Sequence, residues 1–300
     1  MKVLIGTRGS ALALAQTRLV ADDLYRLGAE VEVVPIRTSG DEGKGNRVAP
    51  PGDKSRFVRQ IEEALLSGDI DLAVHSAKDV PGELPEGLAI VGVPEREDPR
   101  DVLCGVASLD DLKEGARIGT GSLRRRAQLL SARPDLHIED LQGNVDTRLR
   151  KLANGDFDAV VLAAAGLARL GRSEEGNPID LTPAPGQGCL ALEARAGDQD
   201  IAALAAQLTH RDSLISLTAE RAVVTALEAS CRTPIAAYAR LSGDALVAEA
   251  FVGLPTGSTW IKDQLEGDPE HPAALGRALA ERLVAVGAKD LLRQAESTAT

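Results

Sequence analysis

Two segments of the chain, more than a hundred residues apart, repeat the same short pattern. Residues 5–10 read Ile-Gly-Thr-Arg-Gly-Ser and residues 118–122 read Ile-Gly-Thr-Gly-Ser, and in both copies a Gln stands six positions after the Ser. Residues 68–74 and 155–161 form a second pair, since both begin Gly-Asp and continue into an apolar run. The repeat predicts two α/β lobes of common design, each with a strand–turn–helix start that can hold an anion. Such a pair of lobes usually binds its ligand in the cleft between them.

The composition narrows the kind of ligand. A length of 300 residues leaves room for two or three domains. The net charge of −11 and the aromatic content of 2% argue against a nucleic-acid partner, which calls for basic patches and stacking rings. Arginine nevertheless recurs at turns and helix starts, which favours a small, negatively charged ligand.

The chain is expected to be a cytoplasmic protein without a membrane segment. Its first apolar run is too short for a signal peptide, and no stretch approaches the ~20 apolar residues of a spanning helix. The three cysteines, Cys104, Cys189 and Cys231, are scattered, as in a reduced cytosolic protein. The cysteines and the four histidines do not have the spacing of zinc ligands, so no metal is expected.

The hydrophobic pattern divides the chain into segments. The first lobe is expected to contain a strand at 3–5, a helix at 10–27, a strand at 31–36, an apolar helical stripe over 57–65 and a buried strand at 70–74. Residues 38–53 form a long loop, which is either a lid or simply flexible. The second lobe starts near Arg100 and includes a strand at 159–164. The Pro/Gly-rich segment 182–188 is expected to return the chain to the first lobe.

The pattern changes beyond about Ser213. The sequence predicts a helix at 214–227, strands at 235–241, 245–253 and 258–263, and a final helix at 272–286. This is the pattern of a small α+β domain with an antiparallel sheet.

The strand at 70–74 leads into His-Ser-Ala-Lys-Asp-Val-Pro at 75–81. Ligands bind at the carboxyl ends of strands in α/β sheets. Lys78 and Asp79 can therefore offer an anion contact and a proton donor or acceptor. The alternative is an ordinary polar turn before Pro81. His75 alone is expected to be a packed, hydrogen-bonded residue and not a catalyst.

Three consecutive arginines follow the second Gly-Thr motif. Positive charge at a helix start opposes the helix dipole unless an anion binds there. Successive residues point about 100° apart around a helix, so the three cannot share one solvated face. The pattern favours recognition of a carboxylate or phosphate by at least two of Arg124, Arg125 and Arg126. Arg148 and Arg169 occupy similar positions after a turn and after a strand.

Cys231 lies in a turn-like Ala-Ser-Cys-Arg-Thr-Pro segment. The adjacent Arg favours the thiolate, although a lone Cys is usually only a small buried residue. Cys104 and Cys189 lie among apolar neighbours and are assigned to packing.

Taken together, these motifs resemble the porphobilinogen deaminase (hydroxymethylbilane synthase) family. The matching segments are Gly-Thr-Arg-Gly-Ser-Ala-Leu-Ala at 6–13, residues 75–81, Gly-Thr-Gly-Ser-Leu-Arg-Arg at 119–125, Gly-Asn-Val-Asp-Thr-Arg-Leu at 143–149, Pro-Gly-Gln-Gly at 185–188, and Cys231 followed by Pro-Ile at 234–235. They run in order from residue 3 to the last helix.

The resemblance implies two lobes like type 2 periplasmic binding proteins, with doubly wound mixed sheets, and a small C-terminal α+β domain with an antiparallel sheet. The expected boundaries are 1–95 plus about 189–207 for the first lobe, 99–183 for the second and 211–300 for the third domain. The resemblance also implies a transferase of tetrapyrrole and heme biosynthesis, acting as a monomer without nucleic acid or membrane. It would join four porphobilinogen units head to tail, release ammonia each time and hydrolyse off the linear tetrapyrrole.

The resemblance also assigns residues. Asp79 would be the catalytic carboxylate and Cys231 the covalent attachment point of a dipyrromethane cofactor. Contacts to the carboxylates of cofactor and substrate would come from Arg8, Ser10, Ser76, Lys78, Thr120, Ser122, Arg124, Arg125, Arg148 and Arg169. Lys54 and Phe57 would lie at the family's flexible lid and beside the pyrroles.

The sequence departs from the family at three places. Gln142 replaces an expected Arg in the cofactor site, Ser55-Arg56 replaces Gly-Leu, and Arg59 replaces Lys. Arg56 or Arg126 could supply the guanidinium missing at Gln142.

Two other functions fit parts of the sequence. A solute-binding protein would explain the duplicated lobes and the arginines, but not the third domain with Cys231. An enzyme of this fold that acts on another anionic substrate, without a covalent cofactor, is the second alternative.

Overall fold

The computed structural model describes residues 1–36, 58–229 and 233–298. Their contacts group into two compact units. One unit contains the described residues up to Glu97 together with Cys189–Leu214, and the other contains Asp98–Gly188 and the described residues from Ile215 onward. Each unit is described by itself below.

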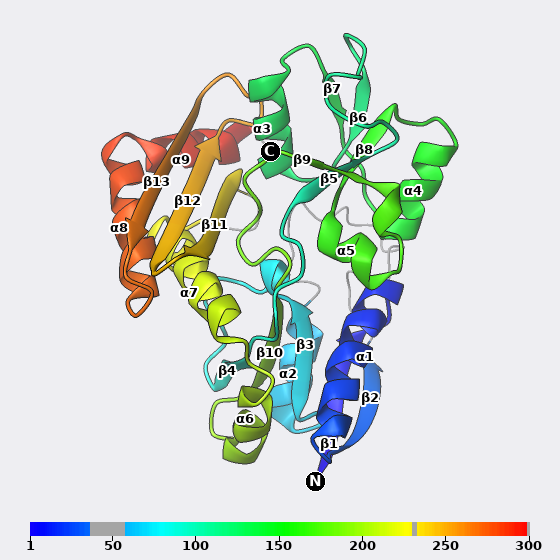
Figure 1. The fold of residues 1–300 in the computed structure, drawn as a ribbon, viewed down its shortest axis with the longest axis vertical. Coiled ribbons are helices and arrows are strands. Elements are labelled where there is room, and N and C mark those ends of the chain that lie inside the picture. Colours follow the sequence, from blue (N-terminus) through cyan, green and yellow to red (C-terminus); the bar gives the residue numbers. More distant parts are fainter. Residues whose placement is uncertain (37–57, 230–232, 299–300) are drawn as a thin grey trace. The chain divides into compact units, whose positions relative to one another are not determined.

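The first unit is built on a five-stranded sheet with strand order β2-β1-β3-β10-β4 (Figure 1). Its elements are β1 (Lys2–Arg8), α1 (Ala11–Arg26), β2 (Glu30–Ile36), α2 (Arg59–Ser67), β3 (Leu72–Ser76), β4 (Leu88–Gly92), β10 (Leu190–Arg195) and α6 (Gln199–Ala206). β1 runs parallel to β2 and β3, whereas β10 runs antiparallel to β3 and β4.

Apolar side chains on both faces of this sheet are buried, which is the pattern of a doubly wound fold. On one face, Val20 and Leu24 of α1 and Ile201 of α6 pack against the sheet. On the other face, Ile61 and Leu65 of α2 pack against it. The expected return of the chain is confirmed, because β10 follows the Pro/Gly-rich segment and joins the first sheet.

The second unit contains a sheet with the equivalent order β7-β6-β8-β5-β9. Its elements are β5 (Asp101–Cys104), β6 (Arg117–Gly119), α3 (Leu123–Ala132), β7 (His137–Glu139), α4 (Val145–Ala153), β8 (Ala159–Ala163), α5 (Ala164–Arg169), the 3₁₀ turn η3 (Ser173–Glu175) and β9 (Asn177–Ile179). β6 is parallel to β7 and β8, and β5 is antiparallel to β8 and β9, as in the first sheet.

The internal repeat is confirmed by this correspondence. The first Gly-Thr motif lies near the end of β1, and the second consists of the last residue of β6 and the residue after it. The Gly-Asp motifs precede β3 and β8. Ser10 and Ser122 are the N-caps of α1 and α3, and their hydroxyl oxygens accept hydrogen bonds from the N–H groups of Ala13 and Arg125.

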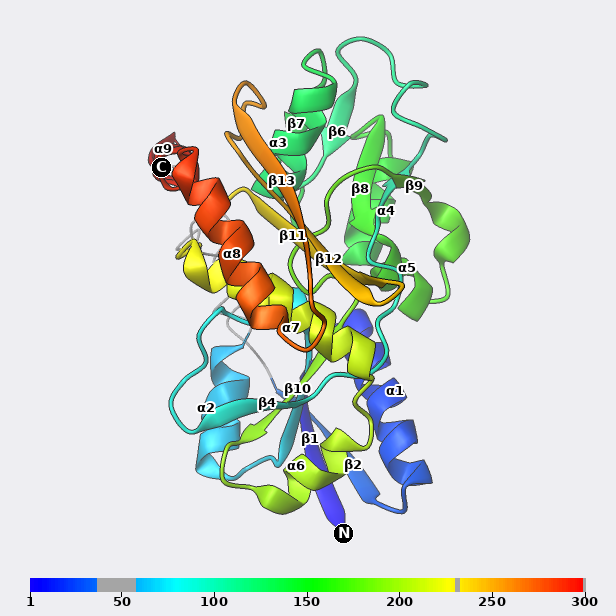
Figure 2. The same cartoon turned by 60° about the vertical axis from the view of Figure 1, so that its left-hand side comes forward.

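The second unit also contains a three-stranded antiparallel sheet of order β11-β12-β13. Its strands are β11 (Ile235–Ser242), β12 (Ala245–Gly253) and β13 (Trp260–Gly267), and the associated helices are α7 (Arg211–Ala226), α8 (Pro272–Ala285) and α9 (Ala288–Thr298). One face of this sheet packs against these helices, as Figure 2 shows for α8. On the other face, Ala236 and Phe251 pack against Ala127 of α3.

Two expectations for this region need correction. The helix over 272–286 is not the last one, because α9 follows after Gly287, which has a φ of +96° and breaks the helical path. The third strand runs over 260–267 and not 258–263. Gly257, with φ of +71°, and Ser258 belong to the β12–β13 turn, where Leu254 N–H donates to the carbonyl of Thr259.

Gly276 marks the closest approach of α8 to α7. A Cβ at this position would lie 2.2 Å from the carbonyl oxygen of Ala219. Gly276→Ala should therefore lower the free energy of unfolding by about 1–3 kcal/mol, the cost of overpacking a well-packed core. The matched control is Gly197→Ala, where a Cβ meets open space. Urea unfolding measures both variants, and equal midpoints would contradict this packing.

Candidate active site

The turn after β3 carries the most reactive of the predicted side chains. β3 lies in the interior of the first sheet, and the 3₁₀ turn η2 (Ala77–Asp79) follows it directly. The Ala77 N–H donates to the carbonyl of Cys189 at 3.0 Å, which fixes the start of the turn. Lys78 and Asp79 are half-buried. An amine and a carboxylate therefore lie together at the carboxyl edge of a buried strand, where α/β proteins bind ligands.

Two side chains of β3 are held by neighbouring elements. Gln16 of α1 donates from Nε2 to Ser76 Oγ at 2.9 Å. His75, which is 6% exposed, lies with Nε2 2.9 Å from Glu193 Oε2 of β10. The expectation that His75 is packed and hydrogen-bonded is thus confirmed. The repeat had indicated Gln16, although without a role.

Arg8 and Ser10 lie at the same edge of the first sheet. β1 and β3 are parallel neighbours, so their carboxyl ends point the same way. Arg8 is the last residue of β1 and is half-buried. Ser10 follows it and caps α1. A basic side chain therefore joins Lys78 and Asp79 at this edge.

Residues of the second lobe occupy the equivalent edge of their sheet. Thr120, directly after β6, is buried, and its N–H donates to the carbonyl of Glu139 at 3.0 Å. Its hydroxyl oxygen accepts a hydrogen bond from the N–H of Ser122 at 3.3 Å. These two hydroxyl residues thereby shape the turn that begins α3.

Arg124 and Arg125 of α3 bind a carboxylate of the protein itself. Both side chains are buried, and between them they enclose Asp101, the first residue of β5, which is 0% exposed. Arg124 Nη1 donates to Asp101 Oδ2 at 2.7 Å, and Arg125 Nε donates to Oδ1 at 2.9 Å. Gln187 adds a third donor to Oδ1 at 3.0 Å. The sequence predicted that at least two of the three arginines recognise the carboxylate or phosphate of a bound anion. The structure shows Arg124 and Arg125 paired with a carboxylate of the protein instead, and their contact with a ligand stays a prediction.

Burial and the two neighbouring guanidiniums act in opposite directions on the pKa of Asp101. Burial raises the pKa of Asp101, but the charges and hydrogen bonds of Arg124 and Arg125 outweigh burial and hold the pKa well below its usual range. The remaining donors of the two arginines reach the carbonyls of Thr182 and Val161. Among the residues that the structure describes, Arg124 Nε and Thr182 Oγ1 are buried in this network without a hydrogen-bond partner.

Three more predicted residues lie in the second lobe. Arg148 on α4 donates from Nε to the carbonyl of Gly143 at 2.8 Å. Gln142 is exposed and donates to Asp140 Oδ2 at 2.9 Å. Arg169 ends α5, directly after β8 as expected, and donates to the carbonyl of Gly188 at 2.6 Å. Cys104 and Cys189 are each 1% exposed, as packing residues should be.

Several predicted positions lie outside the described residues. These are Cys231, Lys54, Phe57, the departures Ser55 and Arg56, and the proposed lid over 38–53.

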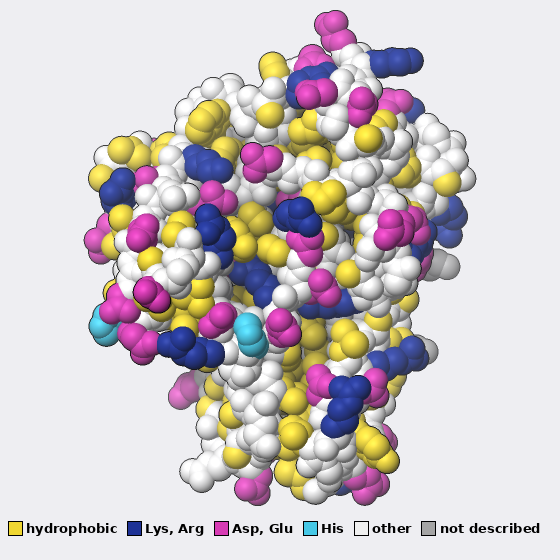
Figure 3. Space-filling model, viewed as in Figure 1, with side chains coloured by type: hydrophobic (Ala, Val, Ile, Leu, Met, Phe, Trp, Pro, Cys, Tyr) yellow, Lys and Arg dark blue, Asp and Glu magenta, His cyan; other side chains and the backbone are white. Residues whose placement is uncertain are grey.

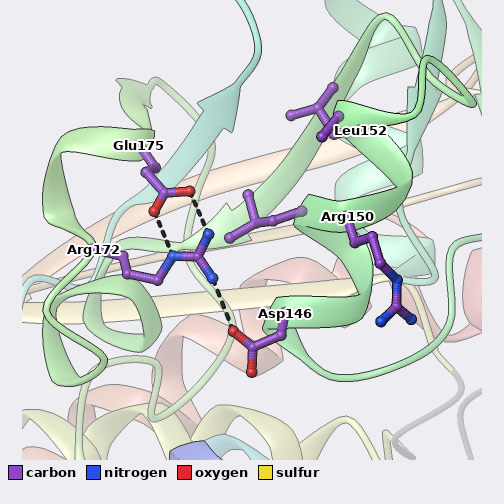
Figure 4. A pocket seen from close by; sticks show the side chains of 7 residues that line it. Asp146, Arg150, Leu152, Arg172 and Glu175 are labelled. Carbon is purple, nitrogen blue, oxygen red and sulfur yellow. Dashed lines mark hydrogen bonds and ion pairs between the residues drawn. The ribbon is translucent and has the colours of Figure 1, made fainter.

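A surface hollow on the second lobe is lined by residues other than the predicted site residues (Figure 4). Its lining comes from α4 and the η3 region and consists of Asp146, Leu149, Arg150, Leu152, Ala153, Arg172 and Glu175. Arg172 bridges Asp146 and Glu175, so much of its charge is neutralised by the protein. Basic and acidic side chains are interspersed with apolar ones over the face in Figure 3.

Within residues 1–36, 58–229 and 233–298, no group of three or more His, Cys, Asp or Glu side chains has the arrangement of a metal site. No helix in these ranges is long and apolar enough to cross a membrane.

The topology defines the class of protein first. Each lobe is a mixed α/β sheet with an antiparallel strand inserted beside the central parallel strands, and the chain passes from the first lobe to the second and back. Among solved structures, a TRAP periplasmic solute binding protein from Desulfovibrio salexigens is similar, with a TM-score of 0.43 and 11% identity over 70% of this chain and 72% of that chain.

The sequence comparisons then identify the family. The porphobilinogen deaminase dipyromethane cofactor binding domain matches residues 3–203, and the porphobilinogen deaminase C-terminal domain matches residues 214–285. Porphobilinogen deaminase of Syntrophus aciditrophicus is 49% identical over 97% of this chain and 98% of its own length, and that of Thermus thermophilus is 47% identical with the same coverage. The chain belongs to the porphobilinogen deaminase family.

Asp101 is the residue of this region that the sequence did not predict. A single Asp before a short apolar run, as in Arg-Asp-Val-Leu-Cys at 100–104, has no distinguishing pattern. Only the fold brings it between two arginines that follow more than twenty residues later.

Asp101→Asn should reduce the free energy of unfolding by about 3–5 kcal/mol, because it leaves two buried guanidiniums without their counter-charge. The folded pKa of Asp101 lies below its unfolded value, so its stabilisation is present at neutral pH. The difference between parent and variant should shrink as the pH falls below about 4. Urea unfolding at several pH values measures this.

The matched control is Asp98→Asn, three residues earlier. Asp98 pairs with the exposed Arg100 at the surface, so its loss should cost no more than about 1 kcal/mol. Equal losses for the two variants at neutral pH would contradict the role given to Asp101.

Proposed function

We propose that Asp79 is the catalytic carboxylate of the family reaction in this chain and that Cys231 carries the dipyrromethane cofactor. The reaction follows from the family: four porphobilinogen units are condensed head to tail with release of ammonia, and the linear tetrapyrrole is released by hydrolysis. The enzyme is a transferase of tetrapyrrole biosynthesis. The observation that carries the assignment of Asp79 is its place on η2, half-buried beside Lys78 at the end of an interior strand.

The chemistry of each addition suits a fixed carboxylate. The C–N bond of the aminomethyl group breaks, ammonia leaves with the electron pair, and the substrate becomes a cation. A pyrrole carbon then forms the new C–C bond and loses its proton. Asp79 can stabilise the positive charge through both steps and accept or return the proton. Its half-buried position strengthens this interaction relative to water.

The cofactor and substrate carry acetate and propionate groups, and the described donors fit them. When bound, the dipyrromethane supplies the pyrrole to which the first substrate unit is joined. Arg8 and Lys78 at the edge of the first sheet supply positive charge for charge-assisted hydrogen bonds.

The remaining assignments complete the proposal. We assign to the cofactor site Lys78, Thr120, Ser122, Arg124, Arg125, Gln142 and Arg148. We assign to the substrate site Arg8, Ser10, Lys54, Phe57, Ser76 and Arg169. Gln142 is an uncharged amide that is already engaged with Asp140, which supports a weaker contact there than an Arg would give.

We also propose that the protein acts as a cytoplasmic monomer and does not bind nucleic acid. The acidic balance of −11 and the aromatic content of 2% support the last point. The scattered cysteines support a reducing compartment.

Asp79→Asn should fold and lose about 10²–10⁴ in turnover, the range for a positioned acid–base group. An amide of the same shape can neither carry the negative charge nor accept the proton. Steady-state assays of ammonia or tetrapyrrole release, on protein confirmed as folded by circular dichroism, measure the loss. Asp79→Glu keeps the charge and should retain more activity than the amide.

Asp69→Asn is the matched control. Asp69 is exposed and precedes the amino end of β3, where its carboxylate accepts a hydrogen bond from Ser67. This variant should keep parental turnover. If Asp79→Asn changes stability but keeps turnover within roughly tenfold of the parent, the turn is only structural and the assignment fails.

Arg148→Leu and Gln142→Ala compare a charged with a neutral contact in the same loop and helix. Arg148→Leu should remove a charge-assisted contact of about 1.5–3 kcal/mol, and enzyme carrying partly extended chains should accumulate. Gln142→Ala should cost less. Native mass spectrometry after limited substrate addition counts the bound units. A larger accumulation in Gln142→Ala would contradict the weaker role of Gln142.

A further inference from the structure

Three titratable side chains are buried together on the face of the first sheet that α2 covers. They are His75 of β3, Glu193 of β10 and Glu62 of α2, with exposures of 6%, 0% and 9%. His75 pairs in register with Ala191, so Glu193, two residues further along β10, lies on the same face as the imidazole. None of the three belongs to the cofactor or substrate contacts proposed above.

The hydrogen bonding within this cluster is incomplete. His75 Nε2 lies 2.9 Å from Glu193 Oε2. Oε1 of Glu193 and Oε1 of Glu62 are both buried and have no hydrogen-bond partner within the described part of the chain. Burial and then the charge of Glu193 raise the pKa of Glu62, so this carboxyl keeps its proton to higher pH than usual. A protonated Glu62 has an O–H donor of the kind that these oxygens lack.

The other charges near this face are accounted for. Arg59 and Glu63 of α2 act on Glu62 with opposite signs. Arg195, two residues beyond Glu193, donates to the carbonyls of Leu65 and Ile70 and pairs with Asp71 and Asp198. Its guanidinium is therefore engaged at the far end of β10.

A buried carboxylate of this kind is costly, and apolar residues of similar size often give equal or greater stability. The strand that carries this carboxylate, β10, is the neighbour of β3 in the sheet. The Cys189 carbonyl, immediately before β10, accepts from the Ala77 N–H, and Glu193 on β10 holds the ring of His75. Gln16 holds Ser76 from α1.

We propose that Glu193 is a positioning residue for Asp79: it holds the ring of His75 and so fixes the end of β3 from which the turn with Lys78 and Asp79 extends. The inference rests on the proposed function of Asp79. Displacements of about 1 Å at a reacting group can reduce rates by 10²-fold, so a loosened strand end is sufficient to impair turnover.

The test compares Glu193→Gln with Glu62→Gln in the full-length, cofactor-loaded enzyme. Glu193→Gln keeps the shape but replaces the carboxylate with a neutral amide, whose oxygen is a weaker hydrogen-bond acceptor for the ring of His75. It should lower kcat by about 10- to 100-fold with KM changed by less than about threefold, because substrate contacts are untouched. Glu62→Gln, whose amide donates as the protonated acid does, should keep kcat within about threefold of the parent.

Steady-state kinetics well below the unfolding temperature separate positioning from stability. Glu193→Asp should recover part of the lost kcat by restoring the charge. If Glu193→Gln does not fold, His75→Asn breaks the same link from the other side and should show the same loss of kcat at constant KM.

A folded Glu193→Gln or His75→Asn enzyme with parental kcat would overturn the inference, as would equal damage from Glu62→Gln. Asp79→Asn, assayed in parallel, keeps the two claims apart. Activity in Asp79→Asn would end the proposed function, whereas an inactive Asp79→Asn beside a fully active Glu193→Gln would end only the positioning role.

Discussion

The burial of one carboxylate between two guanidiniums is the interaction on which the second lobe depends. Asp101 is fully enclosed, and its partners come from α3 and from Gln187 in the segment that returns to β10. The carboxylate of Asp101 therefore holds β5, the start of α3 and the return segment together. Because uncompensated buried charges are far more costly than exposed ones, these three pieces must fold together.

The two lobes have equivalent strand orders and a Gln at the same place in the repeat, but this Gln binds different groups in each lobe. In the first lobe, Gln16 binds the Ser76 side chain beside the turn that carries Asp79. In the second lobe, the equivalent Gln128 binds both backbone groups of Thr182, so the repeated amide anchors the return segment. After β3 the chain forms the η2 turn, but after β8 it continues directly into α5. The repeat therefore preserves the frame, while the segments that follow the two strands differ between the lobes.

The sequence predicted what is encoded locally. The repeated motifs predicted the two strand–turn–helix starts and the buried strand before Asp79, because periodicity is a property of neighbouring residues. It predicted that at least two arginines recognise the carboxylate or phosphate of a bound anion, but not that Arg124 and Arg125 pair with Asp101 of the protein. It gave no role to Glu193, whose partner His75 lies 118 residues away. Helix α9 was missed because it follows α8 after a single glycine break. Contacts between distant segments are set by the fold, and no single segment records them.

The central claim is that an anion-binding α/β frame of this family works through a cofactor attached at Cys231. Mass spectrometry of the purified, active protein, intact and after proteolysis, tests it most directly. The account predicts an adduct equal to two porphobilinogen units less two ammonia molecules, on the peptide that contains Cys231 and absent from Cys231→Ser. An active protein whose Cys231 peptide is unmodified, or an adduct that persists in Cys231→Ser, would contradict it.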